Sequence, residues 1–158
     1  MPEEPAQRLA IIASHGTLDA AYPPFILATA TAAMDMKVAI FFTFYGLSIL
    51  KKGAIDKLKV PPIANPAMPI PIPNIIGMLP GMTALATGMM NKWMARGKVT
   101  KLSELLGLSK EMGVRLIACQ MTMDVMKLKK EDLIDGLEFG GAATFLEFAG
   151  RNAITLTF

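Results

Sequence analysis

The 158-residue chain contains a single cysteine, Cys119, and a single histidine, His15. One cysteine excludes an internal disulfide, an internal resolving thiol and a zinc site made of several cysteines of one chain. Charged residues are also scarce, at 18% of the chain with a net charge of +3. Because no basic cluster is interleaved with aromatic residues, the sequence argues against nucleic-acid binding.

Several sequence motifs are missing as well. The chain has no phosphate-binding loop, no G-x-G-x-x-G, no HExxH and no GxSxG. It has no CxxC, which argues against thioredoxin-type exchange. The first residues, "MPEEPAQRLAIIAS", are acidic and lead into only a short apolar run, so they do not resemble a secretory signal. We therefore expect a protein of the reducing cytoplasm.

Apolar residues make up 53% of the sequence, enough for one domain with a hydrophobic core. Short apolar runs without polar alternation predict buried strands of a mainly parallel sheet, and helical segments alternate with them. The pattern predicts one domain over 1–158, an α/β layer sandwich with a mainly parallel sheet of five or six strands and helices on both faces. The predicted strands are 8–14, 37–44, 114–119, a short one near 138 and 153–158. The predicted helices are 18–34, 46–53, 100–113, 120–128, a short one near 130 and 141–151.

The segment 60–91 has 32 residues without a charge, and seven of them are prolines. Its first half, "PPIANPAMPIPIP", predicts an extended loop, and its second half predicts a helix. We expect an apolar insertion at about 60–94 that is buried in the protein or at a subunit interface, with membrane contact as the alternative.

Cys119 stands in "VRLIACQMTMDVM", where a predicted strand ends and a predicted helix begins. Ligands of open parallel sheets bind beyond the carboxyl ends of the strands. Backbone N–H groups at a helix start favour a thiolate, which is the nucleophilic form. The alternative is a small buried residue without a chemical role.

Two other stretches follow strands and are expected at the same edge of the sheet. His15 in "SHGTLD" is positioned to stabilise a thiolate or bind an anion, or else it is a solvated loop residue. Phe44 and Tyr45 in "FFTFYG" either form a pocket wall or cap the core. The methionines that follow Cys119 are typical core filler rather than copper ligands, so no metal and no cofactor is expected.

Four segments resemble the DsrE/DsrF-like sulfur-carrier family, in the branch often labelled "peroxiredoxin family protein". They are "IIASHGTLDAAYPPFILAT", "VAIFFTFYGL", "NPAMPIPIPNIIGMLPGM" and "LIACQMTMDVMKLKKEDLIDGLEFGGAATFLEFA". The resemblance covers the chain from about Arg8 to Phe158, and its most specific part surrounds Cys119. The Pro-x-x-x-Thr/Ser-x-x-Cys pattern that activates a peroxidatic thiol is absent before Cys119.

The resemblance implies a three-layer α/β sandwich with the strands in a flavodoxin-like order. It also implies a cytoplasmic sulfur carrier or sulfurtransferase with Cys119 as its catalytic residue. It implies that this residue carries sulfur as a persulfide or thiosulfonate and passes it between rhodanese-like and TusA-like proteins. It also implies oligomers, and we expect a homo-oligomer. Six further residues are expected to contact the substrate: His15, Gly16, Thr17, Phe44, Tyr45 and Gln120. Two alternatives stay open, a non-enzymatic oligomeric or membrane-associated scaffold and a thiol peroxidase that uses an external reductant.

Overall fold

Five strands form one parallel sheet in the computed structural model, which describes residues 8–61 and 74–158. The strands are β1 (Arg8–Ala13), β2 (Lys37–Phe42), β3 (Arg115–Cys119), β4 (Glu138–Gly140) and β5 (Ala153–Thr157). Their order across the sheet is β4-β3-β2-β1-β5, and all four pairings are parallel. The carboxyl ends of all strands therefore lie at one edge, as the sequence predicts for the Cys119 site.

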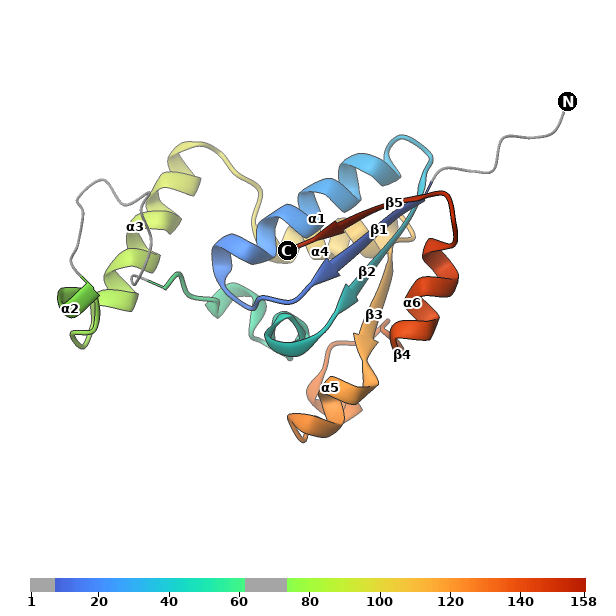
Figure 1. Cartoon of the computed structure of the whole chain (residues 1–158). Helices are drawn as coiled ribbons and strands as arrows, with labels where there is room; N and C mark the ends of the chain where they lie inside the picture. Colours follow the sequence, from blue (N-terminus) through green and yellow to red (C-terminus); the bar gives the residue numbers. More distant parts are fainter. Residues whose placement is uncertain (1–7, 62–73) are drawn as a thin grey trace, which may run out of the picture.

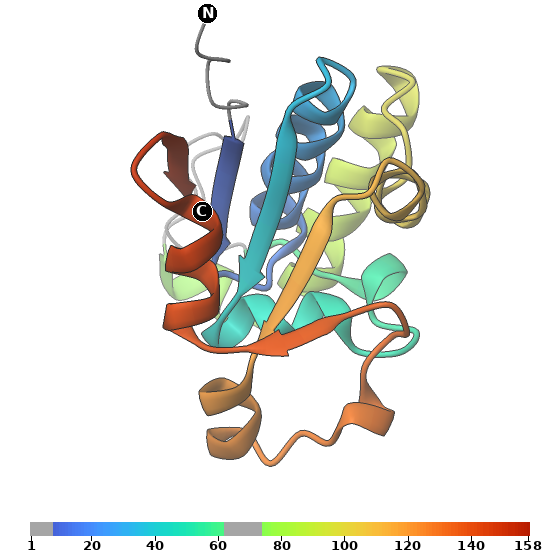
Figure 2. The ribbon, with the colours of Figure 1, turned by 90° about the vertical axis from the view of Figure 1, so that its right-hand side faces the viewer.

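Six α-helices and three short 3₁₀ helices connect these strands in the described ranges. The α-helices are α1 (Leu18–Ala32), α2 (Asn74–Gly77), α3 (Met82–Arg96), α4 (Leu102–Glu111), α5 (Gln120–Val125) and α6 (Ala142–Ala149). The 3₁₀ helices are η1 (Phe44–Leu50), η2 (Ile55–Lys57) and η3 (Lys130–Asp132). Helices α1 and α4 cover one face of the sheet and α6 covers the other (Figures 1 and 2), which confirms the predicted three-layer α/β sandwich.

The strand order differs from the expected flavodoxin-like order, in which the first strand lies between the second and the third. Here β1 lies between β2 and β5. The difference arises because β3 pairs with β2 rather than with β1. In addition, α6 leaves the edge strand β4 and carries the chain back over the sheet to the far side of β1, where β5 pairs (Figure 2). The helix predicted at 46–53 also differs from the structure in type and bounds. The structure has the 3₁₀ helix η1 at Phe44–Leu50.

The two layers next to the sheet are unequal. The larger core cluster lies under α1 and α4 and includes the Phe25–Phe42 ring pair, whose centroids are 5.9 Å apart. The smaller cluster lies under α6 and includes Phe41 stacked on Phe145 at 5.3 Å, together with Cys119. Strands covered on both faces need apolar residues at successive positions, which explains the uncharged runs in the sequence.

The apolar segment 60–91 is described only in part, because the predicted extended loop at 62–73 lies outside the described residues. Its second half contains α2 and most of α3, as the sequence predicts for a helix there. Ala86 of α3 is buried, and the Thr87 hydroxyl accepts a hydrogen bond of 3.0 Å from the Val60 N–H. Within the described ranges, no helix combines the length and the apolar character that crossing a membrane requires.

Candidate functional site

Cys119 is the last residue of β3 and the N-cap of α5. Its φ and ψ angles of −69° and 112° are extended, so the chain leaves the sheet at this residue and turns directly into the helix. The side chain faces the α6 side of the sheet and only 3% of the residue is exposed. The predicted position of the thiol, where a strand meets a helix at the carboxyl edge, is confirmed.

The environment of the thiol acts on its pKa in two opposing directions. Burial raises the pKa, because the charged thiolate loses its hydration. Hydrogen bonds to the sulfur from the hydroxyl and N–H of Thr122, the hydroxyl of Thr43 and the N–H of Met121 lower it. The hydrogen bonds prevail, and the pKa of Cys119 lies below its ordinary value. The site therefore favours the nucleophilic form of the sulfur.

Two buried threonine hydroxyls organise these hydrogen bonds. The Oγ1 atoms of Thr43 and Thr122 are 3.2 Å apart, and the N–H of Phe44 donates to Thr122 Oγ1 over 3.1 Å. A hydroxyl that accepts a backbone N–H still has its own proton to donate. The Thr122 proton can thus be directed at the sulfur, with Thr43 as the second donor. The pair links the ends of β2 and β3 around the thiol.

Sequence reasoning did not identify Thr43 or Thr122. One local signal was present, since Thr122 is three residues after Cys119, which is the position whose N–H an N-cap side chain accepts. Thr43 gives no such signal, because it approaches the thiol only through the pairing of β2 with β3, where Phe42 lies beside Ala118.

The turn that follows Thr43 is held against β1 by glycines. The Gly46 N–H donates to the Ser14 carbonyl over 3.0 Å, and a Cβ at Gly46 would collide with the Ala13 carbonyl oxygen. A Cβ at Gly16 would collide with the Ser48 hydroxyl and the Tyr45 carbonyl. Gly16, expected at the substrate, thus has a packing role, because only glycine allows this close approach.

His15 lies at the expected carboxyl edge of the sheet, but it follows β1, whereas Cys119 ends β3. Strand β2 separates β1 from β3. At the usual strand spacing, the backbone of His15 is therefore about 10 Å from that of Cys119. Its ring is exposed, and Nδ1 lies 3.0 Å from the Ser14 hydroxyl. The structure does not bring His15 into hydrogen-bond contact with the thiol, and its role in binding an anion stays a prediction.

The remaining predicted substrate residues lie in the segments that follow β1, β2 and β3 at the carboxyl edge of the sheet. Phe44 is 58% exposed and Tyr45 is 71% exposed, so neither caps the core. Phe44 also has a φ of 46°, a left-handed conformation that is rare for a bulky residue and that marks strain. Gln120 is exposed and donates to Asp124 over 3.1 Å, and Thr17 is the N-cap of α1. Their contact with a substrate stays a prediction.

Exposed apolar side chains occur on η1 and α5, the elements that follow β2 and β3 at the carboxyl edge of the sheet. We call these side chains the collar; they are Phe44, Tyr45, Met121 and Val125. Met123 of the same helix is buried in the larger core on the opposite face of the sheet from Cys119, so the methionines near the cysteine do not converge on it. In the described ranges, no group of three or more histidine, cysteine or acidic residues is arranged to hold a metal.

The fold and the site define an α/β protein with a single, buried and activated thiol at the carboxyl edge of a parallel sheet. The sequence profile of the DsrE/DsrF/DrsH-like family matches residues 5–157, and the chain belongs to this family. The resemblance seen in the sequence is thereby confirmed.

Two relatives extend over nearly the whole chain. The sulfur carrier protein DsrE2 of Allochromatium vinosum is 47% identical over 156 residues, which cover 95% of this chain and 97% of that protein. The uncharacterized protein YrkE of Bacillus subtilis is 32% identical over 163 residues, covering 97% of this chain and 98% of that protein. Both alignments therefore cover nearly the whole length of the relative.

Proposed function

We propose that the protein is a sulfur carrier that holds transferred sulfur on Cys119. The observation that carries the proposal is the buried thiol whose pKa is lowered by hydrogen bonds from two threonines. The name of the A. vinosum relative, a sulfur carrier protein, supports the same role. A carrier needs one nucleophilic sulfur and no resolving cysteine, which fits a chain with a single thiol.

The transfer step is an exchange between sulfur atoms. The Cys119 thiolate attacks the outer sulfur of a donor persulfide, R–S–SH. The donor S–S bond breaks, R–S⁻ leaves with the electron pair, and Cys119 becomes a persulfide. With tetrathionate, the attack forms Cys119–S–S–SO₃⁻ and releases thiosulfate. Neither reaction changes the total oxidation state, so no external oxidant, metal or organic cofactor is required.

The environment of Cys119 suits both the attack and the storage of the product. A persulfide anion carries its charge on the outer sulfur, where the hydroxyl and N–H of Thr122 and the hydroxyl of Thr43 can be retained as donors with a small shift. Burial limits the access of water and of soluble reductants. The exposed collar offers an apolar contact for a partner that delivers or removes sulfur, and rhodanese-like and TusA-like proteins of the cytoplasm are the proposed partners.

Loading of the folded protein tests this function. With tetrathionate in excess, intact-mass spectrometry is expected to show one added S–SO₃⁻ group on Cys119, removed again by a reductant. A thiol peroxidase would instead consume hydrogen peroxide faster than it reacts with tetrathionate. If Cys119 reacts with neither reagent, and iodoacetamide modifies it only after unfolding, the thiol is inert and a scaffold role replaces the carrier role.

A homo-oligomer is the second part of the proposal, and it rests on the α2–α3 region. Ile75 is 82% exposed, and Met78, Leu79 and Leu85 are exposed close to it in sequence. Single monomers rarely expose an apolar patch of this kind to water. Light scattering in detergent-free buffer is expected to show an oligomer, and the double variant Ile75→Glu with Met78→Glu is expected to dissociate it. A monodisperse wild-type monomer contradicts this prediction, and recovery only from membranes favours membrane contact.

A further inference from the structure

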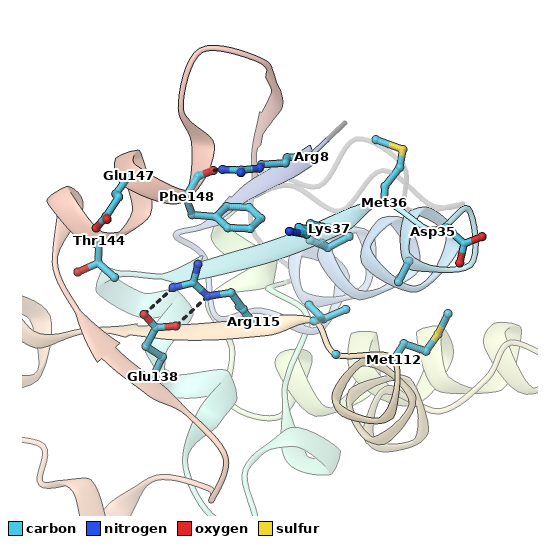
Figure 3. A pocket seen from close by; sticks show the side chains of 14 residues that line it. Arg8, Asp35, Met36, Lys37, Met112, Arg115, Glu138, Thr144, Glu147 and Phe148 are labelled. Atoms are coloured by element: carbon cyan, nitrogen blue, oxygen red, sulfur yellow. Dashed lines mark hydrogen bonds and ion pairs between the residues drawn. The ribbon is translucent and has the colours of Figure 1, made fainter. Parts of the chain in front are cut away.

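A cavity of about 720 Å³ lies at the amino edge of the sheet, the edge opposite Cys119 (Figure 3). Three cationic residues in its lining, Arg8, Lys37 and Arg115, are the first residues of β1, β2 and β3. Phe148 of α6 forms part of the same wall. The proposed carrier function does not use this cavity.

The three cationic side chains lie on one face of the sheet. Arg8 is directly opposite Lys37, and Arg115 is opposite Ala39, two residues after Lys37. Because side chains alternate between the two faces of a strand, this register places all three on the α6 side. Figure 3 shows their charged ends directed toward the region around the Phe148 ring.

Two of these side chains are held in place by protein contacts. Arg8 Nη1 donates to the Phe148 carbonyl over 2.7 Å, and its Cζ atom is 5.7 Å from the centre of the Phe148 ring. Arg115 makes a bidentate ion pair with Glu138, at 2.9 and 2.7 Å, with its Cζ atom 5.1 Å from the same ring. Glu138 neutralises Arg115, whereas the partner of Arg8 is an uncharged carbonyl.

No carboxylate of the residues that the structure describes forms an ion pair with Arg8 or Lys37. Arg115–Glu138 is the only ion pair that the described part of the chain forms. Two further carboxylates line the cavity, but Asp35 turns its carboxylate away from Lys37, and Glu147 lies beside Thr144 on the far side (Figure 3). Like charges directly opposite each other on adjacent strands are destabilising. An anion between them would remove this repulsion.

We propose that the cavity binds an oxyanion, a phosphate or sulfonate group, between Arg8 and Lys37. Arg8 is oriented in advance by Phe148, so its remaining N–H donors can bind oxygen with little loss of side-chain freedom. The volume is within the range of small-molecule sites and exceeds the need of a free ion. The oxyanion is thus either free or the charged end of a larger organic molecule, whose apolar part would lie against Phe148.

Titration of the full chain with AMP, inorganic phosphate and sulfate tests the site. We expect binding by calorimetry, with amide NMR shifts centred on Lys37, Arg115 and Phe148. Lys37→Gln is expected to weaken binding about tenfold or more, because one charge-assisted contact is lost. Lys92→Gln is the matched control, since it removes the same charge from an exposed position of α3 and leaves binding unchanged.

Thermal unfolding verifies separately that the Lys37→Gln variant is folded. Lys37→Gln removes a repulsion, so the ligand-free variant is expected to unfold at no lower temperature than the wild type while losing the stabilisation that the ligand gives. Tighter binding of AMP than of phosphate identifies an organic phosphate, and equal binding identifies the free oxyanion. Absence of binding by all three probes at millimolar concentration, or equal weakening in both lysine variants, overturns the proposal. Cys119→Ser should bind as the wild type does, so failure here is distinct from failure of the carrier function.

Discussion

Cys119→Ser is expected to lose sulfur loading completely while the protein remains folded. Serine cannot form a persulfide or a thiosulfonate, and no second thiol in the chain can replace the lost one. The substituted hydroxyl is smaller than the thiol and is expected to find hydrogen-bond partners in Thr43 and Thr122, so the buried site stays satisfied. Intact-mass spectrometry after incubation with tetrathionate, polysulfide or a persulfide-loaded rhodanese measures the loss, and thermal unfolding verifies the fold.

Two further variants sharpen this result. Cys119→Ala also removes the thiol, but it leaves the threonine hydroxyls without this partner, and we expect it to be less stable than Cys119→Ser by about 1 kcal/mol. His15→Ala is expected to slow loading without abolishing it if the histidine holds the anionic end of the donor. An adduct of unchanged size on Cys119→Ser would locate the sulfur elsewhere and refute the role of Cys119.

The fold was predictable because its strands are recognisable from composition alone. Lys37–Phe42 is apolar at every position after the lysine, which is possible only for a strand covered on both faces. The order of the strands was not predictable in the same way. β3 pairs with β2 and β5 pairs with β1, and both pairings join segments that are far apart in the sequence, so no local pattern indicates them. The 3₁₀ geometry of η1 depends on the close contact of Gly46 with β1, which no local pattern indicates.

The position of Cys119 was also predictable, since a strand-to-helix transition is visible in the sequence around it. The residues that control its chemistry were not. Thr43 and Thr122 are separated by 79 residues along the chain and meet only when β2 and β3 pair. Serine and threonine are common at strand ends and helix starts. Nothing in the sequence therefore distinguishes Thr43 and Thr122 from other hydroxyl residues at such positions. His15 follows β1, which β2 separates from β3, so its ring does not contact the thiol in this structure, and its role in binding an anion stays a prediction.

Thr122→Val is expected to give the largest change in the reactivity of the thiol. Burial raises the pKa of Cys119, and the Thr122 hydroxyl is the first of the hydrogen bonds that lower it. Valine keeps the shape of threonine but cannot donate, so the pKa is expected to rise. A hydrogen bond to a charged group contributes about 1.5–3 kcal/mol, and losing it favours the neutral thiol by that amount. Below the pKa, a higher pKa means a smaller thiolate fraction, so alkylation by iodoacetamide near neutral pH should slow by about tenfold or more.

The measurement is the alkylation rate of the folded protein as a function of pH, for which the whole profile should move to higher pH. Thr122→Ser retains the hydroxyl and serves as the matched control, with a profile close to that of the wild type. Thr43→Val removes the weaker side-chain donor and is expected to give a smaller shift in the same direction. A Thr122→Val profile that superimposes on the wild type would show that the threonine does not stabilise the thiolate.

The same substitution has a predictable effect on stability. Because the pKa of Cys119 is lower in the folded than in the unfolded protein, the thiolate stabilises the fold at a pH above the unfolded pKa. That contribution is lost as the pH falls through the folded pKa. Thr122→Val should remove it, and it also leaves the Phe44 N–H without its acceptor, at a cost of about 1–3 kcal/mol at every pH. The free energy of unfolding of Thr122→Val should therefore lie below that of the wild type throughout, with the difference increasing from acidic to alkaline pH; a difference independent of pH would assign Thr122 a structural role alone.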